Sequence, residues 1–512
     1  MKYPIGIQNF DEIRIGEYAY IDKTRLIYKL VDEGKYYFLS RPRRFGKSLL
    51  LSTLEAYFRG QKELFNGLAI YDLEQEWLEY PVFHIDLNTA NFREKDSLFA
   101  ILNDYLCNWE KEYGKSESET TLALRFKGVV ERAAKKTGCN VVILVDEYDK
   151  PMLQTFHDRE LQDNYRNELK AFYSVLKTQD RYIKFAFLTG VTKFGKVSVF
   201  SDLNNLMDIS MDNRYISICG ITENELKANF KEGIAELSDA TGDTEEATIE
   251  KLRANYDGYH FVDNSIGIYN PFSLLNTLAR LKFDDYWFET GSPTFLVELM
   301  KLHHYELRNL TKEQISADVI NSIDSMSTNP IPVIYQSGYL TIKGYNERFK
   351  KYKLGFPNQE VEQGFLNFLL PRYSSAGDKS SYFIEEFVKD AEAGNPERFM
   401  QRLSTMLADT DYKVVGNTEL YFQNVMYLIF KIMGFYIQVE RPTSDGRIDA
   451  VIQTADYIYI IECKLDKSAD EALRQIEDNN YAAPFQMDKR KLYKIGVNFS
   501  SGTRGVEEYK ID

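Results

Sequence analysis

Apolar residues in the first 230 or so positions gather in short runs separated by longer amphipathic stretches. The runs have the length and the β-branched or aromatic content of buried strands, and the stretches between them have helical spacing. An alternation of this kind predicts an α/β domain built on a parallel sheet. The expected strands are 36–39, 82–87, 141–145 and 184–188, and the expected helices include 98–113, 122–135 and 161–176.

The pattern becomes mostly helical after Thr222-Glu223-Asn224-Glu225, which has the signature of a capping box. Two apolar runs, 331–335 and 339–342, are expected to form a short hairpin beside these helices. The polar segment 374–381 is the best candidate for a domain boundary, and helices should follow it to about residue 409. We therefore expect three parts: a P-loop domain at 1–225, a mostly helical lid or winged-helix-like region at 226–375, and a last α/β domain at 376–512.

The end of the chain has a second, more compact α/β pattern. Its expected elements are a helix at 419–433, strands at 436–441, 447–453 and 457–463, a helix at 469–479 and a strand at 492–498. This α-β-β-β-α-β order matches the core of PD-(D/E)XK nucleases, a restriction-endonuclease-like fold.

Composition and charge exclude several classes of protein. With 44% hydrophobic and 27% charged residues, the chain has the balance of folded domains rather than of disordered ones. No apolar run approaches the ~20 residues of a membrane span, and the start lacks the apolar core of a signal peptide, so we expect a cytoplasmic protein without a membrane partner. Four widely spaced cysteines argue against a disulfide framework or a structural zinc site. The net charge of −14 means that any nucleic-acid contact needs a local groove.

The segment after the first expected strand has the chemistry of a phosphate loop. Residues 40–48 read Ser-Arg-Pro-Arg-Arg-Phe-Gly-Lys-Ser and lead into the helical stretch 49–58. Gly46 would let the backbone approach a phosphate, Lys47 would reach the β- and γ-phosphates, and Ser48 would bind Mg²⁺. Arg41 stands where the general GxxxxGK[ST] pattern has its first glycine. Taken alone, the motif is as compatible with a plain strand–turn–helix as with a nucleotide site.

Two other expected strands end in polar residues. Asp146 and Glu147 follow the run 141–145 and would lie at the carboxyl edge of a parallel sheet, where ligands bind. Asp146 would hold Mg²⁺ and Glu147 would polarise the attacking water. Thr189, after the run 184–188, is the candidate for sensing the γ-phosphate in an ATPase with a strand inserted between the two nucleotide strands. Considered alone, each of these strand ends is compatible with a solvated turn. A phosphate loop upstream of an apolar strand that ends in Asp-Glu, however, seldom arises by chance.

The C-terminal α/β pattern contains its own acidic cluster. Glu462 and Lys464 are two apart on one expected strand, so they share a face, and Asp449 lies on the strand before it. Asp449 and Glu462 can offer oxygen ligands to Mg²⁺ or Mn²⁺, which would activate a water for attack on a phosphodiester. Lys464 would orient that water or stabilise the charge on phosphorus. Glu419, on the preceding helix, could add another acid close to the metal.

Alternatives to a nuclease site remain at this point. A Glu-x-Lys pair on an edge strand is usually a solvated ion pair, and it is Asp449 and the apolar run 457–461 that favour a metal site. Gln475 and Tyr481 are similar to a trailing Gln…Tyr motif of some relatives, with a longer spacing. The basic residues 489–491 and Lys494 could contact phosphates or form a solvated turn.

Four segments, 22–24, 41–48, 146–151 and 200–206, together resemble the bacterial AAA-ATPase-like family, whose members typically carry a C-terminal PD-(D/E)XK nuclease-like domain. The resemblance covers nearly the whole chain. It implies an AAA-type ATPase core in which arginine occupies the first P-loop position, so Arg41 becomes expected, and Arg41 and Arg44 join the nucleotide-binding residues. Because such modules often assemble into rings, it also raises a homo-oligomer formed through the ATPase domain. Arg43, Arg44 and Arg214 are all candidates for an arginine finger.

The function expected from these observations is an ATP-dependent nuclease that uses ATP and Mg²⁺, with Mn²⁺ as an option at the nuclease site. DNA is preferred over RNA only by analogy with the family. The alternative is a nucleotide-driven switch whose nuclease-like domain binds nucleic acid or protein without cutting. A GTPase-like signalling protein is a third option, but residues 191–195 lack the acid of a guanine-specifying N/TKxD motif, which favours adenine.

Overall fold

The computed structural model describes residues 1–193, 199–200, 203, 205–290, 294–312, 314–321, 329–374, 380–408, 418–440, 450–503 and 505–512. They form two compact units, the first containing Met1–Thr290 and Thr311–Glu360 and the second Gly291–Leu310 and Val361–Asp512. The sequence predicts three parts, 1–225, 226–375 and 376–512, and this division into three stays a prediction. Within the described ranges, no helix is both long and apolar enough to cross a membrane.

A five-stranded parallel sheet is the centre of the first unit. Its order is β2-β3-β4-β1-β5. The four predicted strands are confirmed, and the inserted strand lies where the sequence suggested, with β4 between the strand that enters the P-loop and the strand that ends in Asp146. The short edge strand β5 was not predicted, since two residues show no periodicity. The bounds are β1 Tyr36–Ser40, β2 Val82–Asp86, β3 Val141–Asp146, β4 Ile183–Gly190 and β5 Met207–Asp208.

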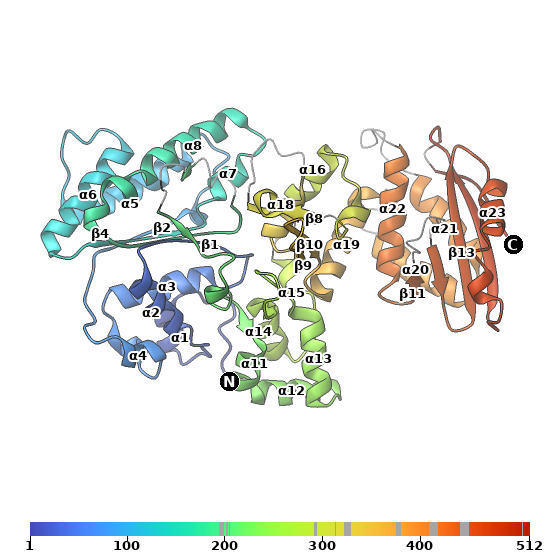
Figure 1. Ribbon diagram of the computed structural model, residues 1–512, viewed down its shortest axis with the longest axis horizontal. Helices are drawn as coiled ribbons and strands as arrows, with labels where there is room; N and C mark the ends of the chain where they lie inside the picture. Colours follow the sequence, from blue (N-terminus) through green and yellow to red (C-terminus); the bar gives the residue numbers. More distant parts are fainter. Residues whose placement is uncertain are drawn as a thin grey trace. The chain divides into compact units, whose positions relative to one another are not determined.

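Helices cover both faces of this sheet (Figure 1). On one face lie α5 (Ser97–Tyr113), α6 (Leu122–Thr137) and α8 (Arg159–Tyr173), and on the other α2 (Thr24–Glu33) and α3 (Lys47–Phe58). Local chemistry sets the ends of α6, because the Thr121 side chain accepts a hydrogen bond from the amide of Leu124 and Gly138 closes the helix with φ of 72°. The predicted helices in this region are confirmed.

The helical region that follows the sheet begins as predicted. Thr222 and Glu225 form a complete capping box at the start of α11 (Glu223–Asn229). Three longer helices pack around Leu226, Phe230 and Leu274 in a buried apolar cluster. These helices are α12 (Lys231–Thr241), α13 (Glu245–Tyr256) and α14 (Pro271–Arg280).

The predicted hairpin of 331–335 with 339–342 is wrong. Residues Ile331–Gln336 form a short helix, α18, with Pro332 in its first turn. The hairpin lies one step further along the chain, where β9 (Thr341–Asn346) pairs antiparallel with β10 (Lys351–Gly355), which also pairs with β8 (Gln314–Ser316). A short apolar run does not distinguish a buried helical turn from a strand by period, and proline fits the first turn of a helix, where its missing N–H is not needed.

The second unit contains a five-stranded sheet in the order β11-β12-β13-β14-β15. Only β13 and β14 run parallel, and α23 (Ala469–Asp478) connects them and packs on them (Figure 1). Helices α20 (Ser380–Glu392), α21 (Pro396–Ala408) and α22 (Thr418–Met433) lie at the opposite face. The predicted order is confirmed in its described part, whereas β15, rich in charged residues, was missed. The strands are β11 Gln438–Glu440, β12 Ala450–Gln453, β13 Tyr457–Leu465, β14 Lys491–Phe499 and β15 Val506–Ile511.

A buried carboxyl group ties α14 to the short helix α15 (Tyr286–Glu289). Glu360 is 2% exposed, and its carboxyl oxygens contact the Ser273 hydroxyl at 2.9 and 2.8 Å and accept a hydrogen bond from the amide of Trp287 at 2.7 Å. Burial raises the pKa of Glu360 to about 8, and the nearby carboxylates of Asp284 and Asp285 add to the rise. At neutral pH the Glu360 carboxyl group is therefore largely protonated.

This protonation predicts a loss of stability with rising pH. Between about pH 4.5 and 8 the folded chain holds a proton on Glu360 that the unfolded chain has released, so the free energy of unfolding should fall by roughly 1 kcal/mol per pH unit. We expect Glu360→Gln, which cannot titrate, to flatten this part of the pH dependence of urea unfolding between pH 6 and 8. The control is Glu362→Gln. Glu362 lies with Glu360 on helix α19 (Gln359–Tyr373), and its carboxylate pairs with Lys431 at 3.5 Å. Equal slopes for wild type and Glu360→Gln would contradict the assignment.

Candidate nucleotide and nuclease sites

The phosphate loop leaves the buried strand β1 and enters α3 at Lys47. Gly46 adopts φ of 93°, and a Cβ placed on it would touch nothing within 4 Å. Glycine is therefore required by the left-handed backbone and not by crowding. The amide of Leu50 donates to the Gly46 carbonyl at 3.0 Å, so the helix starts directly at the loop and its first amides face the site.

Five predicted residues meet at the ends of β1, β3 and β4. The Ser48 hydroxyl donates to Asp146 Oδ2 at 2.5 Å, and the Thr189 hydroxyl donates to Asp146 Oδ1. Lys47 Nζ lies 3.3 Å from Glu147 Oε1. Glu147 has φ of 52°, a left-handed conformation that is uncommon for non-glycine residues. The structure thus brings Lys47, Ser48, Asp146, Glu147 and Thr189 together as the sequence predicted.

The chemistry of this cluster fits a Mg²⁺–nucleotide. Lys47 and Asp146 are each 4% exposed, so each needs a charged or hydrogen-bonding partner. The Ser48 hydroxyl and the Asp146 carboxylate are the hard oxygen donors that Mg²⁺ prefers. Lys47 is held by the carboxylate of Glu147 and by the carbonyls of Arg41 and Pro42, at 3.2 and 3.4 Å, and a bound phosphate could replace the carboxylate.

Burial of Asp149 fixes the end of β4 against β3. Its Oδ2 accepts hydrogen bonds from the Thr192 amide at 2.6 Å and the Thr192 hydroxyl at 2.7 Å. Burial raises the pKa of Asp149 to about 6, and the neighbouring Glu147 carboxylate adds to this. A Cβ on Gly190 would lie 2.7 Å from Asp149 Oδ1, so only glycine allows this close approach. Sequence reasoning missed this positioning role, because the partner lies 43 residues away.

An apolar pocket of about 110 Å³ lies directly beside Gly46. Its walls include Ile21, Leu50, Ile218 and Phe230. At its border Lys23 forms an ion pair with Glu225 at 2.6 Å, and burial lowers the pKa of Lys23. Apolar walls next to a phosphate loop suit a purine ring. The sequence contained no periodic signal for this pocket, since its residues come from distant segments.

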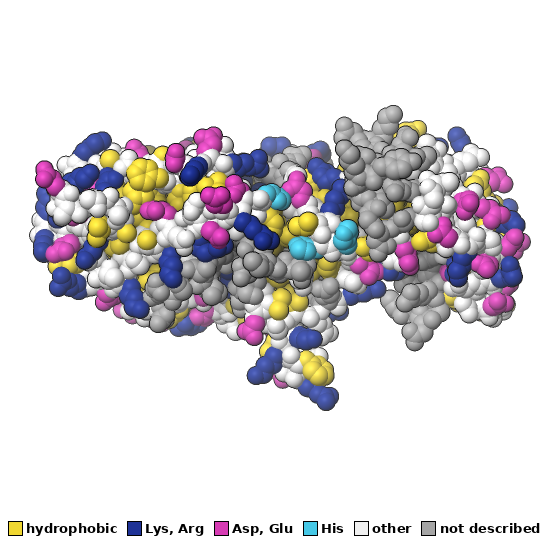
Figure 2. Space-filling model, turned by 90° about the horizontal axis from the view of Figure 1, so that it is seen from above, with side chains coloured by type: hydrophobic (Ala, Val, Ile, Leu, Met, Phe, Trp, Pro, Cys, Tyr) yellow, Lys and Arg dark blue, Asp and Glu magenta, His cyan; other side chains and the backbone are white. Residues whose placement is uncertain are grey.

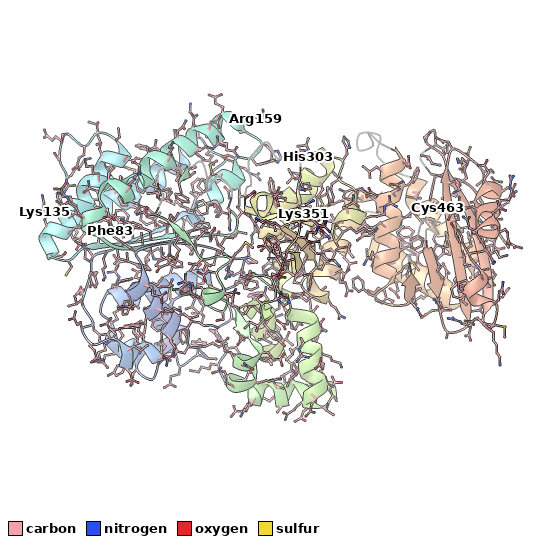
Figure 3. All side chains as sticks on the ribbon, in the orientation of Figure 1. Phe83, Lys135, Arg159, His303, Lys351 and Cys463 are labelled. Carbon is pink, nitrogen blue, oxygen red and sulfur yellow. The ribbon has the colours of Figure 1, made fainter. Side chains whose placement is uncertain are left out.

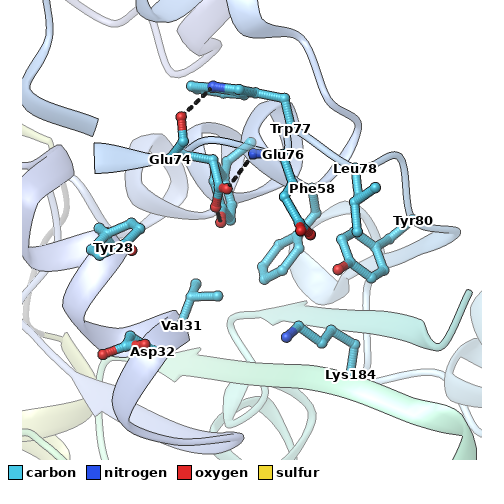
Figure 4. Close-up of a pocket in the computed structure, with 11 residues that line it drawn as sticks. Tyr28, Val31, Asp32, Phe58, Glu74, Glu76, Trp77, Leu78, Tyr80 and Lys184 are labelled. Carbon is cyan, nitrogen blue, oxygen red and sulfur yellow. Dashed lines mark hydrogen bonds between the residues drawn. The ribbon is translucent and has the colours of Figure 1, made fainter. Parts of the chain in front are cut away.

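A different pocket, of about 170 Å³, lies away from the P-loop (Figure 4). Aromatic side chains, among them Tyr28 and Trp77, form part of its walls. It presents the carboxylates of Asp32, Glu74 and Glu76 against the single ammonium of Lys184, which lies over the Tyr80 ring at 6.0 Å. This excess of negative charge disfavours phosphates, so this pocket is a poorer candidate for a nucleotide than the P-loop.

Arg41 is buried behind the phosphate loop. Its Nη1 donates to the carbonyls of Ser40 at 3.0 Å and Ser210 at 2.8 Å, and its guanidinium lies 3.8 Å from the centre of the Phe261 ring. Burial lowers the pKa of Arg41 to about 10. The guanidinium therefore connects the loop to neighbouring segments, while the Arg41 carbonyl faces Lys47.

The structure does not single out any of the three candidates for an arginine finger. Arg43 and Arg44 are exposed, and the Arg44 guanidinium lies 5.0 Å from the centre of the Phe272 ring. Arg214 pairs with Asp212 at 2.6 Å and with Glu33 at 3.3 Å, which occupies its guanidinium. A phosphate role for Arg44 stays a prediction.

In the second unit, β13 presents the predicted Glu-x-Lys pair. Glu462 is 2% exposed, and Lys464 Nζ lies 2.8 Å from its Oε1. The Lys464 ammonium also donates to Gln475 Oε1 on α23, and Gln475 Nε2 donates to the Tyr481 hydroxyl at 3.4 Å. Figure 3 marks Cys463, the residue between the pair, within this sheet. The Glu462 carboxylate is therefore buried next to Lys464, and the side-chain amide of Gln475 orients the Lys464 ammonium.

The structure gives less on the other two predicted nuclease residues. Asp449 lies outside the described residues; β12 begins at Ala450, which pairs with Ile461. Glu419 is exposed and accepts a hydrogen bond from Gln423 at 3.1 Å, and it forms no ion pair with Lys464 among the described residues. Among the described side chains, no group of three or more His, Cys, Asp and Glu is arranged to hold a metal ion.

The basic residues near the C-terminus are largely engaged within the chain. Arg490 pairs with Asp488 at 2.7 Å, and Lys494 pairs with Glu477. Figure 2 shows basic and acidic side chains mixed over the C-terminal unit at its right end. A contact of these cations with phosphates stays a prediction.

Comparison with known proteins finds one family match in each half of the chain. The family described as predicted AAA-ATPase matches residues 4–200, and the PD-(D/E)XK nuclease superfamily matches residues 417–509. A relative from Azotobacter chroococcum mcd 1, named "Uncharacterized protein in vnfD 5'region", is 34% identical over 523 aligned positions, which cover 100% of this chain and 99% of the relative. The ORC2 protein of Aeropyrum pernix, solved in ADPNP–ADP complexes, aligns with 12% identity over 71% of this chain and 96% of its own, at a TM-score of 0.25, which is too low to bear on fold or function.

Proposed function

We propose that this chain, which belongs to the predicted AAA-ATPase family and ends in a domain of the PD-(D/E)XK nuclease superfamily, hydrolyses ATP and cuts DNA with a divalent metal. The observation that carries the first activity is the contact of Ser48 and Thr189 with Asp146 beside the Lys47–Glu147 pair. DNA as the substrate rests on the superfamily alone.

At the P-loop, Ser48 and Asp146 would hold Mg²⁺, which when bound neutralises charge on the phosphates. Lys47 would exchange the Glu147 carboxylate for phosphate oxygens. That exchange frees Glu147 to orient the attacking water and accept its proton. The Thr189 hydroxyl donates to Asp146, and this contact supports Thr189 as the residue that would sense the γ-phosphate.

At the C-terminal site, Glu462 together with Asp449 would hold Mg²⁺ or Mn²⁺, and that ion would supply an activated water. Gln475 keeps the Lys464 ammonium next to Glu462, from where it could stabilise the charge that develops on the phosphate. Glu419 stays a candidate for an additional acid on α22.

The test uses the purified full-length protein with linear and circular DNA, with Mg²⁺ or Mn²⁺, and with or without ATP. We expect metal-dependent cleavage that ATP changes, together with ATP hydrolysis. Cleavage at the same rate with and without ATP would support the nuclease activity and refute its coupling to ATP hydrolysis. ATP hydrolysis without cleavage under any condition would replace the proposal by a nucleotide-driven switch that binds without cutting.

Glu147→Gln separates ATP binding from hydrolysis. Since the amide retains the size of the side chain but cannot accept a proton, we expect the hydrolysis rate to fall by about 100-fold or more. ATP binding, measured by calorimetry, should remain. The control is Glu131→Gln on α6, whose carboxylate pairs with Lys135. Hydrolysis by Glu147→Gln at the wild-type rate would exclude Glu147 as the base.

A further inference from the structure

We propose that Trp287 is a positioning residue of the nucleotide site, holding the phosphate loop from outside the parallel sheet. Its indole N–H donates to the carbonyl of Arg43 at 3.0 Å, across 244 residues of sequence. The inference deepens the proposed ATP binding and rests on it. It assigns to α15 a role in presenting backbone amides to the phosphates.

Several carbonyls of the loop contact donors within the protein. Lys47 Nζ contacts the carbonyls of Arg41 and Pro42, and the amide of Gly220 donates to the carbonyl of Phe45 at 3.1 Å. The indole N–H of Trp287 donates to the carbonyl of Arg43. In the part of the chain that the structure describes, the amides of Arg43, Arg44 and Gly46 have no hydrogen-bond acceptor.

This arrangement leaves the amides for a ligand. In a planar trans peptide the C=O and the following N–H point in opposite directions, so holding the Arg43 carbonyl fixes the direction of the Arg44 amide. Arg44 and Gly46 have φ of 63° and 93°. Successive amides in such alternating conformations form a concave site for an anion. Trp287 therefore sets one of the peptide planes on which phosphate binding depends.

Trp287 is itself held at both ends. Its amide donates to Glu360 Oε1 at 2.7 Å, and its ring lies 5.1 Å from that of Tyr339. A Cβ on Gly338 would lie 2.6 Å from Pro42 Cβ and 3.6 Å from the Trp287 ring. Glycine at 338 thus lets this segment approach the loop closely, and the 4% exposed Trp287 side chain has little freedom to leave it.

The experiment compares wild type with Trp287→Phe, which keeps an aromatic ring but lacks the N–H donor. Calorimetry would measure binding of ATP, of inorganic tripolyphosphate and of adenosine. We expect Trp287→Phe to weaken ATP and tripolyphosphate about fivefold, the worth of one neutral hydrogen bond, and to leave adenosine unchanged. The matched control is Trp109→Phe, whose ring stacks on Phe83 at 4.3 Å on the other side of the unit and should bind all three like wild type.

Gly338→Ala is the second variant, because its methyl group would press on Pro42 and move the same segment from the loop. It should reproduce the loss of tripolyphosphate affinity even if Trp287→Phe does not fold. Unchanged tripolyphosphate binding in a folded variant would overturn the inference, as would an equal loss of adenosine and tripolyphosphate, which indicates general loosening. If wild type binds neither ATP nor tripolyphosphate, the proposed function itself fails, and the inference with it.

Discussion

Lys47→Ala should reduce ATP hydrolysis by at least about 100-fold, since the ammonium would be lost from the place where phosphate charge develops. The side chain is 4% exposed and lies 3.3 Å from Glu147 Oε1, so no solvent cation stands in for it readily. ATP affinity should fall as well. The measurement is phosphate release at saturating ATP together with calorimetric binding.

The matched control is Lys184→Ala, which removes a lysine from β4 at the acidic pocket away from the P-loop (Figure 4). It should hydrolyse ATP at the wild-type rate. Removing Lys47 also leaves the Glu147 carboxylate without its ion-pair partner, so a thermal unfolding curve must accompany the assay. A folded Lys47→Ala protein that hydrolyses ATP normally would refute the assignment of the phosphate loop.

Lys464→Ala should remove metal-dependent DNA cleavage, with a loss of about 100- to 1,000-fold, because a positioned cation next to the scissile phosphate stabilises charge in the transition state. The ammonium lies 2.8 Å from Glu462 Oε1 and is also held by Gln475. Gln475→Ala should lower cleavage less, since it only loosens the orientation of Lys464. Both are measured on linear DNA at saturating Mg²⁺.

Lys467→Ala provides the control for this site, because Lys467 is exposed directly after β13. It removes the same charge from the same domain without touching the pair. We expect cleavage within twofold of wild type, the scatter of such assays for a surface change. Equal losses in Lys467→Ala and Lys464→Ala would show that net charge, and not a positioned ammonium, supports DNA contact.

Local patterns sufficed for much of the fold. The four long strands of the first sheet, the capping box at Thr222 and the order of the C-terminal elements follow from periodicity and cap chemistry, which act over a few neighbouring residues. The run 331–335 was misread because a short apolar segment is compatible with a helix and a strand alike, and packing chose the helix. The strand β15 was missed because its charged residues conceal the alternation.

The candidate sites divide in the same way. Sequence alone was enough to name Lys47, Ser48 and Asp146 as candidates, because each follows an apolar run or opens a helix at a characteristic spacing. Glu462 was named because it follows the apolar run 457–461 and because Asp449 lies on the preceding expected strand. Only the tertiary structure decided that Asp149 would hold the end of β4 and that the Arg41 guanidinium would lie in a buried contact with Phe261. It also decided that Trp287 would reach the phosphate loop over 244 residues. The spacing of residues in the sequence depends on interactions between neighbours along the chain. These contacts depend instead on which distant segments pack together, and local periodicity contains no information about that.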